Sequence, residues 1–351
     1  MLDPVSIPLP LPHVHSVNAW LLPGEPLTLV DTGPRDDAAL SALEVGLWRE
    51  GVRVEDVELV LATHHHLDHV GLAATIQRRS GATIAVLDRV ADYAERYAEE
   101  VEQDRRFAHA LMTHHGVPEQ IIADDEGFWA YIRSTSEEFR ADVRLVDGDH
   151  IQAGGRNLRV VARPGHSTTD ALFVDDRDGL AFAGDHLLAA ISSNTEIYAA
   201  ERAQDGQARS RIRYLENLER TAEMPLRRLL TGHGPPVTAH AELVEARLRE
   251  HARRCERIVA ILEDGPATAF DIARGLWPVR TVRTQPLLVV WEVVGHMELL
   301  LAAGLVVERT GDGMSVFELN DDSRRCARGA RPPLSRRQWH RRLPRDCSER
   351  S

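Results

Sequence analysis

The residues best suited to chemistry form the run HHHLDH at positions 64–69, which has the pattern H-x-H-x-D-H. The run directly follows the apolar segment 57–63, which we expect to be a strand. Neutral imidazoles and carboxylates are normal zinc ligands, and two metal ions about 3.5–4 Å apart can divide such a set between them. We expect positions 64 and 66 to face one ion and positions 68 and 69 the other, while His65 faces elsewhere.

Three further candidate ligands follow singly along the chain: His166 in PGHS, Asp185 in GDH and His233 in TGHGP. Their small neighbours allow the backbone to approach a metal ion closely. Each lies at the end of a predicted strand, where a loop on a rigid sheet commonly carries chemistry. These strands cover residues 157–164, 180–185 and 227–232. The recurring order of strand, ligand-rich loop and helix predicts an α/β fold with a mixed sheet.

Taken in order, these motifs resemble those of the metallo-β-lactamase superfamily, in which HxHxDH is followed by His, Asp and His. The resemblance covers roughly residues 13–240 and implies an αββα sandwich with two zinc ions per chain. It implies that one ion is bound by His64, His66 and His166. It implies that the other is bound by Asp68, His69 and His233, with Asp185 as the bridge. Because these ligand types also suit other first-row divalent ions, zinc is expected from the resemblance and the ligand types together.

Two residues are expected beside the ligands rather than among them. Asp31, in the segment VDTG, matches a further motif of the family, and the resemblance makes it a support for the HxHxDH loop. The sequence alone fits equally well with a turn or N-cap Asp before a helix at 36–49. His186 follows the bridging position but matches no ligand of the family, so we expect it to pack next to the metal site.

The chemistry predicted for this site is hydrolysis. A water or hydroxide held between two zinc ions has its pKa lowered to near 7 and attacks a carbonyl carbon or a phosphorus atom. Asp68 is the best candidate for orienting this water and passing on a proton, a role that the resemblance supports. The mechanism needs no Ser or Cys nucleophile. The three cysteines are widely spaced and form neither a disulfide framework nor a CxxC clip.

A length of 351 residues exceeds that of most single cores, so we expect more than one domain. The catalytic domain is expected at 1–240, with a charged, helical insertion at 89–145 that covers the site. Residues 241–320 show three helices and a hairpin, the order of a winged-helix domain. The tail 321–351 is rich in Arg and Pro and is expected to be disordered.

The predicted winged-helix domain has features that bear on its partner. We expect Thr268 to cap a helix at 269–277. The helix predicted at 286–303 contains Glu292 and Glu298 but no Arg, although a winged helix normally suggests DNA. We therefore expect this helix to pack against the catalytic domain or a second copy of the chain, which would make a homo-oligomer.

Charge and hydropathy limit the partners and the location. The net charge is −12, and residues 324–351 alone contribute +8, from ten Arg and two acids, which leaves about −20 on the rest. An acidic body disfavours nucleic acid as the partner. No apolar run is long enough to span a membrane, and the proline-broken N-terminus lacks a basic signal region, so we expect a cytoplasmic protein without membrane contact.

The expected substrate is a small acyl ester, thioester or lactone. Asp185 stands where the best-known zinc β-lactamases have a cysteine, which argues against antibiotic hydrolysis. Glyoxalase II shares the seven-ligand pattern and cleaves a thioester, but its C-terminal part is helical. A catalytic domain followed by a winged helix looks like the β-lactamase-like branch, which includes thioesterases of acyl-carrier substrates and an endoribonuclease.

Two alternatives remain open at this point. A metal-dependent phosphodiesterase or endoribonuclease is supported by the Arg-rich tail and by Arg280 and Arg283 near the predicted wing. A DNA-binding regulator with a non-catalytic metal domain is disfavoured by the intact ligand set.

Overall fold

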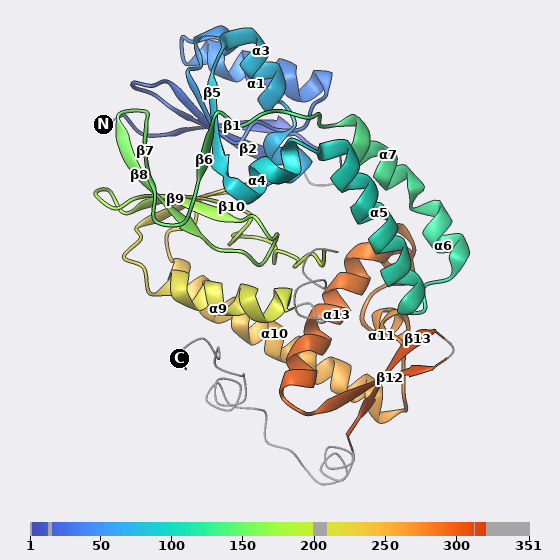
Figure 1. Cartoon of the computed structure of the whole chain (residues 1–351). Coiled ribbons are helices and arrows are strands. Elements are labelled where there is room, and N and C mark those ends of the chain that lie inside the picture. Colours follow the sequence, from blue (N-terminus) through green and yellow to red (C-terminus); the bar gives the residue numbers. More distant parts are fainter. Residues whose placement is uncertain (1, 13–15, 199–208, 312, 321–351) are drawn as a thin grey trace, which may run out of the picture. The chain divides into compact units, whose positions relative to one another are not determined.

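The computed structural model describes residues 2–12, 16–198, 209–311 and 313–320 (Figure 1). The chain divides into two compact units. The first unit comprises Met1–Asp104, Phe128–Ser193 and Arg213–Val244, and the second comprises Arg105–Gly127, Asn194–Ile212 and Glu245–Ser351. The tail predicted at 321–351 lies outside the described residues.

The first unit contains a six-stranded sheet whose strands follow the order of the chain. They are β1 (Val5–Pro10), β2 (Ser16–Leu22), β3 (Thr28–Val30), β4 (Leu59–Ala62), β5 (Thr83–Leu87) and β6 (Val143–Leu145). The pairs from β1 to β3 are antiparallel, and those from β3 to β6 are parallel. Strand β4 is buried along its whole length, which its continuous apolar run explains.

A second sheet of the same unit has the order β11-β10-β9-β8-β7. Its strands are β7 (His150–Ala153), β8 (Arg156–Ala162), β9 (Ala171–Asp175), β10 (Leu180–Gly184) and β11 (Arg228–Thr231). One hydrophobic cluster contains Leu61 and Ile84 from the first sheet together with Phe173 and Phe182 from the second. Because these four side chains are fully buried, the two sheets pack face to face around a shared core.

Helices cover the outer faces of both sheets in the first unit (Figure 1). On the first sheet lie α1 (Asp37–Arg49), α2 (Leu67–Val70), α3 (Ala73–Ser80) and α4 (Asp88–Ala94). Helix α1 packs so closely on β1 that a Cβ at Gly46 would lie 2.3 Å from the side chain of Ile7. Helix α9 (Ser210–Ala222) contacts the loop after β8, where Asn217 donates to the Pro164 carbonyl at 2.7 Å. The predicted αββα sandwich is thus confirmed.

The predicted insertion at 89–145 is largely helical, as expected. It contains most of α4 and all of α5 (Tyr97–His114), α6 (Glu119–Asp124) and α7 (Glu126–Ser134), and it ends with β6. Its middle part, Arg105–Gly127, belongs to the second unit. Its role as a cover for the site stays a prediction.

The C-terminal elements follow the predicted order, with one added helix. They are α10 (His240–Glu263), α11 (Ala269–Leu276), α12 (Val279–Thr284), α13 (Pro286–Ala302), β12 (Val306–Gly311) and β13 (Met314–Leu319). Thr268 caps α11 as expected, and its hydroxyl accepts from the Asp271 backbone N–H at 3.1 Å. Helix α12 was not anticipated. Helix α10 begins at residue 240, where the boundary was predicted, whereas the first compact unit extends to Val244; the boundary and the winged-helix assignment stay predictions.

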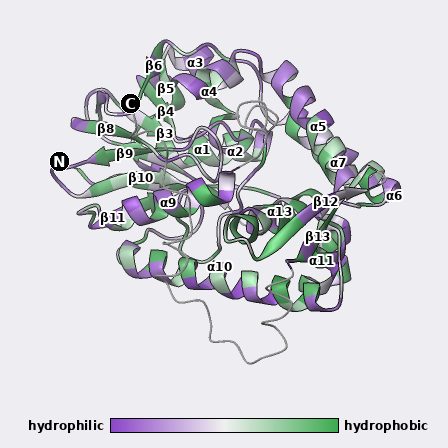
Figure 2. Ribbon diagram, turned by 60° about the horizontal axis from the view of Figure 1, so that its bottom comes forward, coloured by the Kyte–Doolittle hydropathy of each residue, from purple (hydrophilic) through white to green (hydrophobic). Residues whose placement is uncertain are grey.

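Helix α10 alternates between purple and green along its length, which shows an amphipathic surface (Figure 2). Twelve of the 17 residues of α13 are buried, in keeping with its apolar sequence. No described helix combines the length and the apolar character that crossing a membrane requires.

Candidate metal centre

The run at 64–69 begins two residues after β4 and changes direction at His66. His66 is the N-cap of the short helix α2, so the preceding residues are extended and the following ones are helical. The His69 backbone N–H donates to the His66 carbonyl at 2.9 Å and closes the first turn. This change from strand to helix turns the two halves of the motif toward different points in space.

The first group of candidate ligands consists of His64, His66 and His166. The Nδ1 of His66 lies 3.0 Å from the Nε2 of His64 and 3.1 Å from the Nε2 of His166. Although the sequence separates His166 from His66 by 100 positions, the loop after β8 brings the two rings together. Three imidazole nitrogens therefore converge on one point, as a tetrahedral zinc site requires of its protein ligands.

The second group consists of Asp68, His69 and His233. The Oδ2 of Asp68 lies 3.2 Å from the Nε2 of His233 and 3.6 Å from the Nε2 of His69. His233 comes from the loop directly after β11, where the sequence placed it. This group offers one carboxylate and two imidazoles to a second ion.

Asp185 lies between the two groups. Its Oδ2 is 3.7 Å from the Nε2 of His166 in the first group and 3.3 Å from the Nε2 of His233 in the second. Its Oδ1 is 3.6 Å from the Nε2 of His69. A carboxylate that faces both groups has the position expected of a bridging ligand.

Two buried ligand atoms without a hydrogen-bond partner, and a glycine packed against one of them, indicate that this set of side chains fits metal ions. The buried atoms His69 Nε2 and Asp185 Oδ1 have no hydrogen-bond partner within the described ranges. Such orphaned buried atoms are rare unless an ion or water occupies the space between them. A Cβ at Gly232 would lie 2.3 Å from Asp185 Oδ1, so only glycine permits this approach of the backbone. The residues present therefore fit two divalent ions.

Residues that directly follow strands β3 and β4 hydrogen-bond to the rings of His69 and His64. Asp31 Oδ2 lies 2.8 Å from His69 Nδ1, and its Oδ1 accepts from the Thr63 backbone N–H at 2.8 Å. The hydroxyl of Thr63 in turn lies 3.1 Å from His64 Nδ1. Asp31 has a φ of 60°, an uncommon left-handed conformation for a residue other than glycine. The N-cap of α1 is Asp36, so the structure places Asp31 at the centre rather than at the helix.

His65 and His186 point away from the two groups. The Nδ1 of His65 lies 2.8 Å from Thr169 Oγ1, and its ring contacts Tyr93 at 4.2 Å between centroids. The Nε2 of His186 lies 2.9 Å from Thr221 Oγ1 on α9. Both are buried, and burial lowers the pKa of His186 to about 3, so its imidazole is neutral. These contacts place both rings outside the two groups, and the expectation that neither is a ligand stays a prediction.

Neighbouring groups of opposite charge outweigh burial in setting the pKa values of Asp68, Asp185 and His233. Burial alone would raise the pKa of Asp68 and Asp185, but the surrounding histidines hold both well below their ordinary value. Burial alone would lower the pKa of His233, but the two carboxylates raise it to about 12. Both carboxylates are therefore ionised at neutral pH, and a metal ion would replace the proton on His233.

Sequence reasoning missed the residues that hold the ligand loops. Thr63 is one of them, and its place directly before His64 at the end of a strand was a usable signal. Asp170 accepts from the Ser167 backbone N–H at 2.8 Å and shapes the loop of His166. Asn18 contacts the loop of His233 across 213 positions, and no local pattern could have indicated this.

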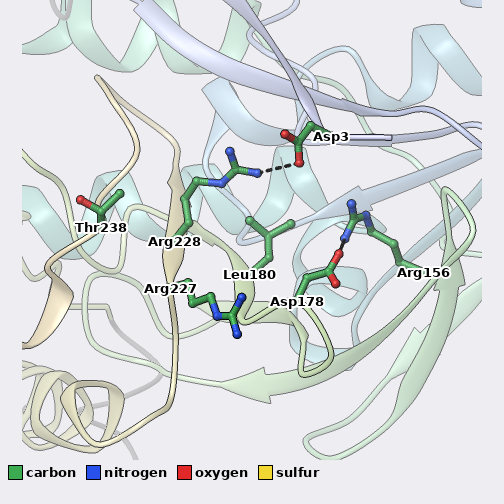
Figure 3. A pocket seen from close by; sticks show the side chains of 7 residues that line it. All are labelled: Asp3, Arg156, Asp178, Leu180, Arg227, Arg228 and Thr238. Atoms are coloured by element: carbon green, nitrogen blue, oxygen red, sulfur yellow. Dashed lines mark hydrogen bonds and ion pairs between the residues drawn. The ribbon is translucent and has the colours of Figure 1, made fainter. Parts of the chain in front are cut away.

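A separate pocket in the first unit lies at the opposite ends of β10 and β11 from the ligands (Figure 3). Its volume is about 370 Å³, and it is lined by Asp3, Arg156, Asp178, Leu180, Arg227, Arg228 and Thr238. Figure 3 shows Arg228 paired with Asp3, at 3.2 Å, and Arg156 paired with Asp178, at 2.8 Å. None of these lining residues belongs to the candidate metal centre, so the pocket is separate from it.

Comparison with known proteins gives an independent view of the chain. Residues 13–233 match the family described as "Metallo-beta-lactamase superfamily". A curated relative from Bacillus subtilis, "Probable metallo-hydrolase YqjP", is 29% identical over 86% of this chain and 92% of its own length. A "Hydroxyacylglutathione hydrolase" from Methylococcus capsulatus is 25% identical over 66% of this chain and 68% of its own length.

A solved structure extends the similarity to both units. The "metallo-beta-lactamase family protein TTHA1429" from Thermus thermophilus is 29% identical, with a TM-score of 0.77. The match covers 90% of this chain and 98% of that protein.

Proposed function

Because the chain belongs to the metallo-β-lactamase superfamily and is a metal-dependent hydrolase, we propose that it cleaves a small acyl ester, thioester or lactone at two zinc ions. In this proposal, His64, His66 and His166 bind one ion, and Asp68, His69 and His233 bind the other. Asp185 bridges the two. The convergence of these seven side chains is the observation that carries the proposal.

Bound zinc ions would make water acidic enough to attack at neutral pH and would polarise the substrate carbonyl. The Oδ2 of Asp68 faces His69 and His233, so we assign its Oδ1 to the attacking water. The carboxylate is ionised, accepts a hydrogen bond from this water and thereby orients it. It then takes the proton and passes it to the leaving group. The Asp68 side chain is 16% exposed against 10% for Asp185, so it is the carboxylate more open to an entering substrate.

Two observations support an acyl substrate. Asp185 faces both groups of candidate ligands, and the glyoxalase II pattern has an Asp at this place in the motif order. The relative from Methylococcus capsulatus is named for hydrolysis of hydroxyacylglutathione, which is a thioester. Support for the alternative, cleavage of a phosphodiester or RNA, comes from Arg280 and Arg283, both of which are exposed on α12.

The test is a hydrolysis screen with acyl thioesters, lactones, an activated phosphodiester and a short single-stranded RNA. Wild type is compared with Asp68→Asn and with the control Asp264→Asn, which alters an exposed Asp in the second unit. We expect turnover of a thioester, ester or lactone that falls by about 10²- to 10⁴-fold in Asp68→Asn and is kept in the control. Cleavage of only the phosphodiester or the RNA would overturn the acyl assignment.

A further inference from the structure

Strand β2 of the first sheet reaches across to the loop that carries His233 in the second sheet. The side-chain Nδ2 of Asn18 donates to the Thr231 carbonyl at 3.0 Å and to the Gly234 carbonyl at 2.9 Å. The backbone N–H of Asn18 donates to the Gly232 carbonyl at 2.7 Å. Three carbonyls of one four-residue loop are thus held by a single residue of a distant strand.

A second side chain of β2 adds to this contact. Trp20 Nε1 donates to the same Thr231 carbonyl at 3.1 Å. Asn18 and Trp20 are 5% and 4% exposed, so water does not compete with these bonds. The backbone carbonyl of Ser16, also on β2, accepts from His233 Nδ1 at 2.7 Å and fixes the tilt of the ring.

The loop leaves the second sheet just before His233: the Gly232 backbone N–H still donates to the Gly184 carbonyl of β10 at 2.7 Å, and the Thr231 hydroxyl donates to the His233 carbonyl at 3.0 Å. Strand β11 ends at Thr231, and Gly234 has a φ of 71°, which only glycine adopts without strain. The two carbonyls bound by the Asn18 side chain, those of Thr231 and Gly234, lie on either side of His233 in the sequence. The amide orientation follows from its environment, because Ser6 Oγ donates to Asn18 Oδ1 at 3.1 Å and leaves both amide hydrogens for the loop.

We infer that Asn18 is a positioning residue for the second metal ion, because it fixes the loop that places His233 Nε2 against Asp68 and Asp185. This inference rests on the proposed dinuclear centre. Within the described residues, no hydrogen bond joins Asn18 to His64, His66 or His166, so we expect its main effect on the ion held by Asp68, His69 and His233. A residue that merely stabilised the fold would affect both ions alike.

The variant Asn18→Asp tests this inference with no change in size. A carboxylate would set oxygen acceptors against the carbonyls of Thr231 and Gly234, where the amide now donates. We expect the affinity for the second ion to fall by about 10- to 100-fold, the usual effect of losing an outer partner of a ligand. The affinity for the first ion stays within about twofold.

The measurement is a competition titration of metal-free protein with Co²⁺ and Zn²⁺, which gives one dissociation constant for each ion. Asn157→Asp is the control, since Asn157 is an exposed strand residue that accepts from Gln152 at 3.0 Å. Trp20→Phe removes one donor to the Thr231 carbonyl and keeps the ring, so it should weaken the second ion less than Asn18→Asp. It also serves as the test if Asn18→Asp does not fold.

Selective weakening of the second ion in Asn18→Asp or Trp20→Phe supports the inference, and selective weakening of the first ion contradicts it. Equal weakening of both ions, or no weakening of either, overturns it. If the wild type itself binds fewer than two ions, the proposed dinuclear centre fails instead, and the variants are not needed to show it.

Discussion

Groups of histidines and carboxylates lie close together in both compact units. In the first unit, seven such residues form the proposed metal centre. In the second unit, His251 on α10 lies beside Glu292 and His296 on α13. Both groups are largely buried, and both contain ligand types that zinc accepts. Residue type and proximity alone do not distinguish them.

The two groups differ in what their carboxylates face. Asp68 and Asp185 face histidines in every ion pair described for them. In the second unit, Glu292 pairs with the guanidinium of Arg211, which is fully buried, and lies 3.6 Å from that of Arg254. A divalent ion at Glu292 would have to compete with two fixed cations.

The two histidines of the second unit, His251 and His296, hydrogen-bond to each other and to the backbone. His296 Nδ1 donates to the Glu292 carbonyl at 2.6 Å, so its Nε2 is the acceptor for His251 Nδ1 at 3.1 Å. Burial lowers the pKa of both histidines, to about 4 for His296, so the pair is neutral. We therefore interpret this group as a structural network. The guanidinium groups of Arg211 and Arg254 beside Glu292, rather than the residue types, separate this group from the proposed metal centre.

The largest expected effect is on metal content, and it is tested by replacing one carboxylate with its amide in each of the two groups. Asp185→Asn removes the negative charge that faces both groups of candidate ligands, and we expect the metal content to fall and hydrolysis to drop by on the order of 10³- to 10⁴-fold, from the loss of several kcal/mol of stabilisation. Glu292→Gln should leave the metal content unchanged. Elemental analysis measures the metal content of both variants. Equal loss of metal in both would refute the distinction between a metal centre and a structural network.

The next effect concerns the stability of the second unit. Arg211→Met leaves the buried Glu292 without its main partner, and breaking a buried ion pair costs about 3–5 kcal/mol in the free energy of unfolding. Urea unfolding measures this cost. The control Arg249→Met removes an exposed pair with Glu245, at 3.7 Å, and should cost less than about 1 kcal/mol. Similar costs for both variants would count against a structural role for the network.

Acid should destabilise the network with a predictable sign. The pKa of His296 is lowered to about 4, mainly by burial, whereas the unfolded chain binds this proton near pH 6.5. Between pH 6.5 and 4, His296 is therefore protonated in the unfolded state but neutral in the folded state. We expect the free energy of unfolding to fall by up to about 3 kcal/mol between pH 6.5 and 4.

Glu292 extends the same trend to lower pH. Burial would raise its pKa, but Arg211 and its other neighbours lower it to about 2 from 4.5, so its contribution is present above pH 4.5 and disappears toward pH 2. Urea unfolding of wild type and His296→Gln across this range isolates the part due to the histidine. A pH dependence that is unchanged in the variant would contradict the assignment to His296.

The smallest expected effect concerns Asp31, whose carboxylate lies against the ring of His69. Asp31→Asn keeps a residue that tolerates the left-handed backbone but removes the charge that faces His69 Nδ1. We expect the metal affinity to fall by about 10- to 100-fold. The competition titration measures it, with Asp36→Asn as a control, because Asn caps a helix as well as Asp does. An unchanged affinity would limit Asp31 to holding the backbone.

The sequence predicted what depends on local order. The strand ends before the HxHxDH run and before the candidate ligands at 166, 185 and 233 were predicted, because each motif lies where a strand meets a loop. Contacts between distant segments were not predictable. His115 stacks on Phe317, and Asn18 holds the loop of His233, although nothing near either residue in the sequence indicates its partner. Such contacts also assign Arg105–Gly127 to the second unit.

The central claim is that the seven residues of the first unit bind two metal ions. Elemental analysis of the protein purified without added metal, with protein concentration from amino-acid analysis, tests it most directly. We predict a ratio near two zinc ions per chain in the wild type. A ratio well below two that does not rise when zinc is supplied and excess ion is removed would contradict the account.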